Sequence, residues 1–184
     1  MLLVSQNLLR YGTKFPKDTV LRVNLAWVSS LNKLQSFLSE YNNDIFLDYP
    51  IGRTKPPSNK YELEEIKELI KKNERIKYFA VSNVESADDI KQAISLLSSL
   101  LLIVPKIESK AAVENLSDIS SILEGQKIFM LDHDDLFSDL INNKIPPTEF
   151  FSYIEQVENF CNENSIKLLR TRGVIFSDED EYNY

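Results

Sequence analysis

The stretch Leu101-Leu102-Ile103-Val104-Pro105-Lys106-Ile107-Glu108 decides the fold, because an apolar run closes here on a lysine and a glutamate. A second such run, Ile128 to Leu131, closes on acidic residues that include Asp135. Parallel strands that are buried on both faces have continuous apolar runs of this kind. If both runs are strands of one barrel, their charged residues emerge at the end where barrel enzymes do their chemistry. A lysine and carboxylates gathered there would suit a hard divalent cation that holds an anionic, oxygen-rich ligand.

Strand-like runs alternate with helix-like segments along the whole chain. The apolar runs predict strands at 20–25, 45–47, 78–81, 101–104, 128–131 and 166–169. Apolar residues at helical spacing predict helices near 31–38, 63–70, 90–97, 113–119 and 151–161. This alternation predicts an α/β fold with a parallel sheet and helical crossovers. The chain has only four glycines and no Gly-rich turn after a strand, so a parallel (β/α) TIM-type barrel is favoured over an open nucleotide-binding sheet.

The length of the chain limits this barrel. A complete eight-stranded barrel typically needs ~250 residues, and the chain has 184. The barrel is therefore expected to be shortened, incomplete or finished by another chain, with further strands considered at Met1 to Val4 and Val174 to Phe176. Residues 1–176 are predicted to form one barrel-like domain, and residues 177–184 an acidic, solvated tail. Because open strand edges must be covered, we expect either a homodimer or an edge sealed by the amino-terminal segment and the tail.

Composition excludes several partners. The formal charge of −7 argues against binding to nucleic acid or to an anionic membrane surface. No apolar run approaches the ~20 residues of a membrane span, and the apolar run Met1 to Val4 is too short for a signal peptide to be expected. Cys161 is the single cysteine, so neither an internal disulfide nor a cysteine-rich zinc site is expected. The sequence predicts a cytoplasmic protein with a small-molecule substrate.

Five segments between about Leu21 and Leu136 resemble motifs of the pyruvate kinase family, in the family's order. The segment 22–26, RVNLA, resembles R-l-N-F-S, and LDYP at 47–50 with Gly52 resembles L-D-x-x-G-P. The segment 78–90, YFAVSNVESADDI, is similar to D-x-V-A-x-S-F-V-R-x-A-x-D-v. KIES at 106–109, with VENLSDI at 113–119, resembles K-I-E-n-x-x-g-v-x-N-x-d-e-I, and MLDHDDL at 130–136 resembles M-v-A-R-G-D-L. Pyruvate kinases and the related HpcH/HpaI aldolase and citrate lyase barrels bind pyruvate, its phosphate or its enolate on a divalent metal.

The resemblance implies a role for each matching residue. Glu108 and Asp135 would be the ligands of Mg²⁺ or Mn²⁺. Lys106 would place a positive charge at the enolate oxygen or at a transferred phosphoryl group, and Arg22 would anchor an anionic group. Thr171 matches, more weakly, the threonine of the family's A-T-Q-M motif and would be a further catalytic residue. The floor of the substrate site would be completed by Asn24, Asp48 and Ser82.

The sequence also departs from the family. Ala26 and Tyr49 replace residues that help to bind a monovalent cation, so such an ion gains little support here. His133 and Asp134 stand in place of the arginine and glycine beside the metal-binding aspartate. The family inserts a lid domain after the segment that resembles 52–55, whereas here a loop and one helix are expected there. The carboxy-terminal domain of the family has no counterpart in the sequence.

Each of these residues also allows a purely structural interpretation. Lys106 and Glu108 could form an ion pair at a strand end, and Arg22 and Asp48 could bridge adjacent strands. The aspartates at 132, 134 and 135 could cap the next helix. Three functions therefore stay open: a metal-dependent enzyme of pyruvate or phosphoenolpyruvate, a carbon–carbon lyase or aldolase of the related barrels, and a non-catalytic barrel module. The lysine favours the first, the missing lid favours the second, and the short length favours the third.

Overall fold

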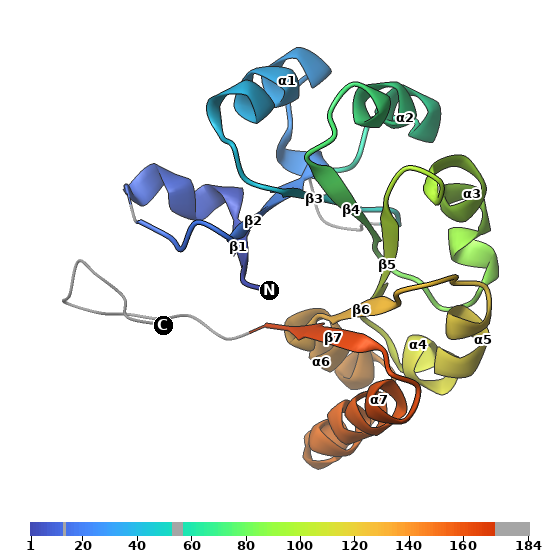
Figure 1. Cartoon of the computed structure of the whole chain (residues 1–184). Coiled ribbons are helices and arrows are strands. Elements are labelled where there is room, and N and C mark those ends of the chain that lie inside the picture. Colours follow the sequence, from blue (N-terminus) through green and yellow to red (C-terminus); the bar gives the residue numbers. More distant parts are fainter. Residues whose placement is uncertain (13, 53–56, 172–184) are drawn as a thin grey trace.

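A single parallel sheet organises the chain. The computed structural model describes residues 1–12, 14–52 and 57–171, and in this part seven strands pair in sequence order, each parallel to the next. The strands are β1 (Leu3–Ser5), β2 (Val20–Asn24), β3 (Ile45–Tyr49), β4 (Ile76–Val81), β5 (Leu102–Ile107), β6 (Ile128–Leu131) and β7 (Lys167–Arg170). The sheet curls into a half-barrel with helices around its outer side (Figure 1). The predicted α/β class and shortened, barrel-like parallel sheet are confirmed at this level.

Helices fill most of the connections between strands. They are α1 (Leu31–Glu40), α2 (Leu63–Lys71), α3 (Asp88–Leu97), α4 (Lys110–Glu114), α5 (Leu116–Ser121), α6 (His133–Asn142) and α7 (Phe150–Glu163). The connections also contain three short 3₁₀ helices, η1 (Gln6–Tyr11), η2 (Leu25–Trp27) and η3 (Pro147–Glu149). The predicted helix at 113–119 is divided at Asn115, which lies outside the helical region at φ −111°. The sequence pattern did not assign η1 or α6.

Local sequence explains where several helices begin. Ser30 and Ser109 cap α1 and α4, since each hydroxyl accepts a hydrogen bond from a backbone N–H in the first turn. Glu62 and Glu65 form a reciprocal capping box at the start of α2. Asp132 caps α6 by accepting from the backbone N–H of Asp135 at 3.4 Å. One of the three aspartates therefore has the capping role that the structural interpretation assigned to the group.

Side chains alternate between the two faces of each strand, so the core has two parts. Residues such as Leu47, Phe79 and Phe129 belong to the large cluster between the sheet and its helices. The alternate positions form a small second cluster on the other face of the sheet, made of Val20, Phe46, Ala80, Val104, Ile128 and Met130. Because side chains alternate faces along a strand, the residue two positions further along shares this inner face. The inner face therefore continues, toward the carboxyl ends of the strands, into Arg22, Asp48, Ser82, Lys106 and Asp132.

The amino-terminal segment adds a strand to one edge of the sheet. The strand considered at Met1 to Val4 exists as β1 and forms one edge, and all six other predicted strands are present. The considered strand at 174–176 and the acidic tail at 177–184 lie outside the described residues. Between β3 and β4, the described residues form one helix, α2, and no inserted domain. A homodimer that completes the sheet stays a prediction.

Two further features bear on the expectations from composition. Among the described residues, every helix is too short or too polar to cross a bilayer. Cys161 is a free, buried thiol in α7, and burial raises its pKa to about 11. A thiol with so high a pKa is mostly protonated at neutral pH and unreactive. The cysteine is therefore a packing residue.

Candidate active site

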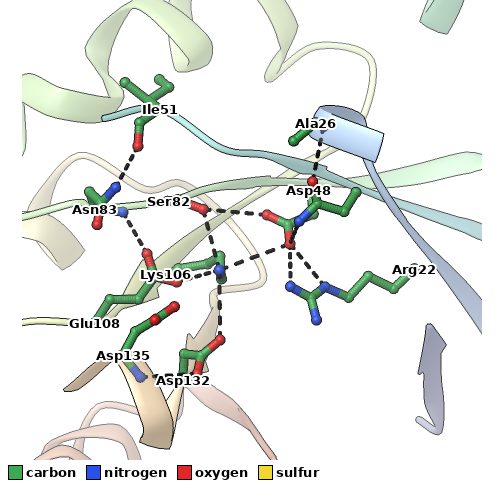
Figure 2. A network of polar contacts seen from close by, with 11 residues as sticks. Arg22, Ala26, Asp48, Ile51, Ser82, Asn83, Lys106, Glu108, Asp132 and Asp135 are labelled. Carbon is green, nitrogen blue, oxygen red and sulfur yellow. Dashed lines mark hydrogen bonds and ion pairs between the residues drawn. The ribbon is translucent and has the colours of Figure 1, made fainter. Parts of the chain in front are cut away.

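Polar side chains from five adjacent strands converge at the carboxyl ends of the sheet (Figure 2). Arg22 lies in the middle of β2 and Asn24 ends it, Asp48 lies near the end of β3, and Ser82 directly follows β4. Lys106 lies on β5, with Glu108 directly after it, and Asp132 directly follows β6. The alternation described above brings these side chains to one face. The register agrees, since Asn24 lies beside Asp48 on the neighbouring strand.

Asp48 is the hub of one half of the cluster. Its side chain is fully buried, and its Oδ2 accepts hydrogen bonds from Nε at 2.9 Å and from Nη2 of Arg22. Nδ2 of Asn24 also donates to Oδ2, and the hydroxyl of Ser82 donates to Oδ1, both at 3.4 Å. A buried carboxylate is tolerated only when it is paired in this way. The three residues that the resemblance placed on the floor of the site are therefore joined to one another and to Arg22.

Lys106 joins this hub to an acidic group. Its Nζ lies 3.9 Å from Asp48 and 3.8 Å from Asp132, forms a close ion pair with Glu108, and donates to the Ser82 hydroxyl at 3.3 Å. Only 4% of the residue is exposed. Burial lowers the pKa of Lys106, but Asp48 and Glu108 outweigh burial and raise the pKa above its ordinary value. The site therefore holds a permanent positive charge out of contact with bulk water.

Glu108 is buried, and its two carboxylate oxygens contact different groups. Oε2 accepts the backbone N–H of Asn83 at 2.7 Å. Oε1 forms the close ion pair with the Lys106 ammonium, and no other described group donates to it. Burial raises the pKa of Glu108, which Lys106 and the Asn83 N–H only partly oppose. A second cation would favour the ionised carboxylate that burial disfavours.

Glu108, Asp132 and Asp135 form a group that can offer three carboxylate oxygens to one ion. One oxygen from each residue lies within 4.8 Å of the other two. All three donors are hard oxygens, which suit Mg²⁺ or Mn²⁺ and not a thiophilic metal. Together with Asp48, four carboxylates surround only two cationic side chains, so a divalent cation would also reduce the local excess of negative charge. The buried Oε1 of Glu108, whose close polar neighbour is the Lys106 ammonium, belongs to the same set of oxygen donors.

The structure places the predicted site residues as follows. Arg22, Asn24, Asp48, Ser82, Lys106 and Glu108 form one connected network. Asp135 is exposed at the start of α6 and joins the network through the acidic group. Thr171 follows β7 with an exposed side chain, and no hydrogen bond joins it to the network within the described residues.

Two residues in the network were not predicted as part of the site. Asp132 was considered only as a helix cap, although its place as the first residue after β6 could have indicated a site position. Asn83 contributes a backbone N–H, which no residue pattern reveals. Two departures from the family also have structural explanations. Tyr49 points to the outer face, where its hydroxyl donates to the Tyr61 carbonyl at 3.0 Å, and the ring of His133 packs edge-on against Phe150.

A separate cavity of about 390 Å³ lies on the outer face of β2. Its lining includes Trp27, Phe37 and Tyr41, and none of the ionic residues above. Chemistry, and not cavity volume, identifies the candidate active site, because the strand ends bring buried ionisable groups of both signs together.

Comparison with known proteins shows a similarity of fold and no sequence relative. No protein-family model matches the sequence, and no curated protein matches it significantly. Among solved structures, the chain is similar to the crystal structure of RipC from Yersinia pestis, with a TM-score of 0.62 and 16% sequence identity. The match covers 96% of this chain and 77% of that one. The curled α/β architecture therefore recurs in a known protein, and at this identity the similarity concerns the fold alone.

Proposed function

We propose that the chain is a divalent-metal-dependent enzyme that acts on pyruvate, phosphoenolpyruvate or a related 2-oxo acid through an enolate. In this proposal the half-barrel is a shortened TIM-type barrel of the pyruvate kinase-like kind. The observation that carries it is the meeting of Glu108, Asp132 and Asp135 beside the buried ammonium of Lys106. The carboxyl ends of parallel strands are also the usual place for chemistry in such folds. A cytoplasmic location and a small-molecule substrate belong to the same proposal.

The charge of each side chain determines its role in this proposal: carboxylates bind the metal, and cationic side chains bind the substrate. Glu108, Asp132 and Asp135 would hold Mg²⁺ or Mn²⁺, which when bound supplies Lewis-acid polarisation of the substrate's oxygens. Lys106 offers a fixed positive charge where an enolate oxygen becomes negative, and a preorganised charge of this kind stabilises a transition state. Arg22 keeps 25% of its side chain exposed, so its guanidinium can anchor a substrate carboxylate. Asp48 holds both cationic side chains in place. Thr171 has no role in this proposal.

A carbon–carbon lyase or aldolase is the second candidate. One observation favours it: between β3 and β4 the described residues form only α2, so they supply no lid domain. Phosphoryl transfer needs water to be excluded, which a lid commonly achieves. Cleavage of a carbon–carbon bond through an enolate uses the same carboxylates without a nucleotide. Both candidates share the enolisation step, so one experiment tests them together.

The test is exchange of the methyl protons of pyruvate into D₂O, followed by ¹H NMR. We expect the wild-type protein to catalyse exchange with Mg²⁺ or Mn²⁺ present and to lose this activity in EDTA. Asp135→Asn is expected to abolish exchange, because it removes one oxygen of the acidic group. Asp134→Asn is the matched control, since Asp134 is the exposed neighbour on the same helical turn and lies outside that group. Failure of the metal-loaded wild type to exchange protons, with and without aldehyde co-substrates, would favour the non-catalytic module.

A further inference from the structure

Asn83 has an unusual backbone conformation for its position. Its φ is +52°, and only Lys144 and Ser165 share a positive φ among the non-glycine residues that the structure describes. Those two follow the caps of α6 and α7, where a left-handed residue commonly ends a helix. Asn83 instead follows a strand and Ser82. Asparagine tolerates this conformation better than most residues, but no helix end explains it here.

In this conformation Asn83 donates two hydrogen bonds to neighbouring strand ends. The backbone N–H of Asn83 donates to Oε2 of Glu108 at 2.7 Å, and its side-chain Nδ2 donates to the carbonyl of Ile51 after β3. Gly52 permits this approach, because a Cβ at that position would lie 3.3 Å from Nδ2 of Asn83. Asn83 therefore connects the ends of three neighbouring strands, β3, β4 and β5, as Figure 2 shows.

We propose that Asn83 is a positioning residue for Glu108. Its left-handed backbone aims the N–H at Oε2 and fixes the rotation of the carboxylate, so that Oε1 faces Lys106. Partners that orient a ligand in this way commonly decide its affinity for a metal. The inference rests on the proposed metal site for its consequence, but the positioning contact itself can be measured without metal.

The metal-free readout is the amide proton of residue 83 in ¹H–¹⁵N spectra. A short N–H···carboxylate bond shifts this proton downfield. We expect the shifted resonance in the wild type and in Asn83→Gly, which keeps both the N–H and the left-handed backbone. We expect it to move upfield in Glu108→Gln, which removes the charge of the acceptor. An amide proton that does not respond to Glu108→Gln would overturn the positioning contact, whatever the metal does.

The metal readout is the affinity for Mn²⁺, measured by calorimetry. Asn83→Gly should bind within about threefold of the wild type, because it keeps the backbone geometry. Asn83→Val should bind ~10-fold or more weakly, because a β-branched side chain disfavours a positive φ. Lys144→Val is the matched control, since it places the same strain at the end of α6, and it should leave the affinity unchanged. Circular dichroism verifies that each variant is folded.

The outcomes separate the two proposals. Normal Mn²⁺ affinity in folded Asn83→Val would overturn the positioning role and leave the metal site intact. A wild type that binds no Mn²⁺ but has the amide resonance that responds to Glu108→Gln would overturn the metal site and support the positioning contact.

Discussion

Replacing Lys106 with methionine is expected to slow the enolisation of pyruvate by ~10²–10³, the usual loss when one preorganised electrostatic contact is removed. The reason is that the charge of Lys106 matters most in the transition state, where the enolate oxygen becomes negative. The structure gives this lysine a raised pKa and places it against the acidic group. The measurement is the rate of methyl-proton exchange per metal-loaded molecule, with Mn²⁺ binding determined in parallel.

The matched control for this variant is Lys110→Met. Lys110 lies four positions further along the chain and forms an exposed ion pair with Glu114 on α4. Such surface pairs contribute little, so exchange should be unaffected. If Lys106→Met lowers the melting temperature while exchange per metal-loaded molecule stays at the wild-type rate, Lys106 is only a structural partner of Glu108. That result would remove the lysine from the mechanism.

Replacing Asp48 with alanine is expected to lower the free energy of unfolding by about 3–5 kcal/mol, which is typical when one partner of a buried ion pair is removed. Asp48 is fully buried and accepts hydrogen bonds from Arg22, Asn24 and Ser82. Without it, the guanidinium of Arg22 loses its partner, and Lys106 loses one of its three carboxylates. Urea denaturation followed by tryptophan fluorescence or circular dichroism measures the change.

Asp88→Ala is the control for this stability prediction. Asp88 is exposed on the first turn of α3, where it pairs with Lys91. Its loss should cost no more than about 0.5 kcal/mol, because exposed pairs are weak. A change of under ~1 kcal/mol for Asp48→Ala would mean that water or a local rearrangement replaces its contacts, and Asp48 would then not be the hub of the cluster.

The sequence predicted the sheet well because buried parallel strands leave a local pattern. The apolar runs at 101–104 and 128–131 became β5 and β6, and the charged residues that follow them lie at one end of the sheet. The prediction that Lys106 and Glu108 lie near the aspartates after β6 followed from these strand ends alone. Arg22 and Asp48 were placed in the same site only by the resemblance to a family, and their contact is explained by the alternation of faces along β2 and β3.

The parts that could not be predicted depend on geometry outside the local pattern. Asp132 both caps α6 and contributes to the acidic group, and a sequence does not reveal that one carboxylate can do both. The proposed role of Asn83 depends on its backbone N–H and on a left-handed conformation, which a residue pattern does not reveal. Tyr49 differs from the family's pattern because its ring faces the helices and not the site.

The proposed metal site is tested most directly by a crystal structure of the protein soaked with Mn²⁺ and oxalate, which mimics the enolate of pyruvate. Data collected for manganese anomalous scattering would locate the ion. We expect one strong anomalous peak in contact with carboxylate oxygens of Glu108 and Asp135, with Asp132 close by and oxalate beside Lys106. Mg²⁺ in the same place should have oxygen ligands at about 2.0–2.1 Å. An anomalous map with no peak between these carboxylates, while the pair of Lys106 and Glu108 stays closed, would contradict the claim that these strand ends form a metal-dependent active site.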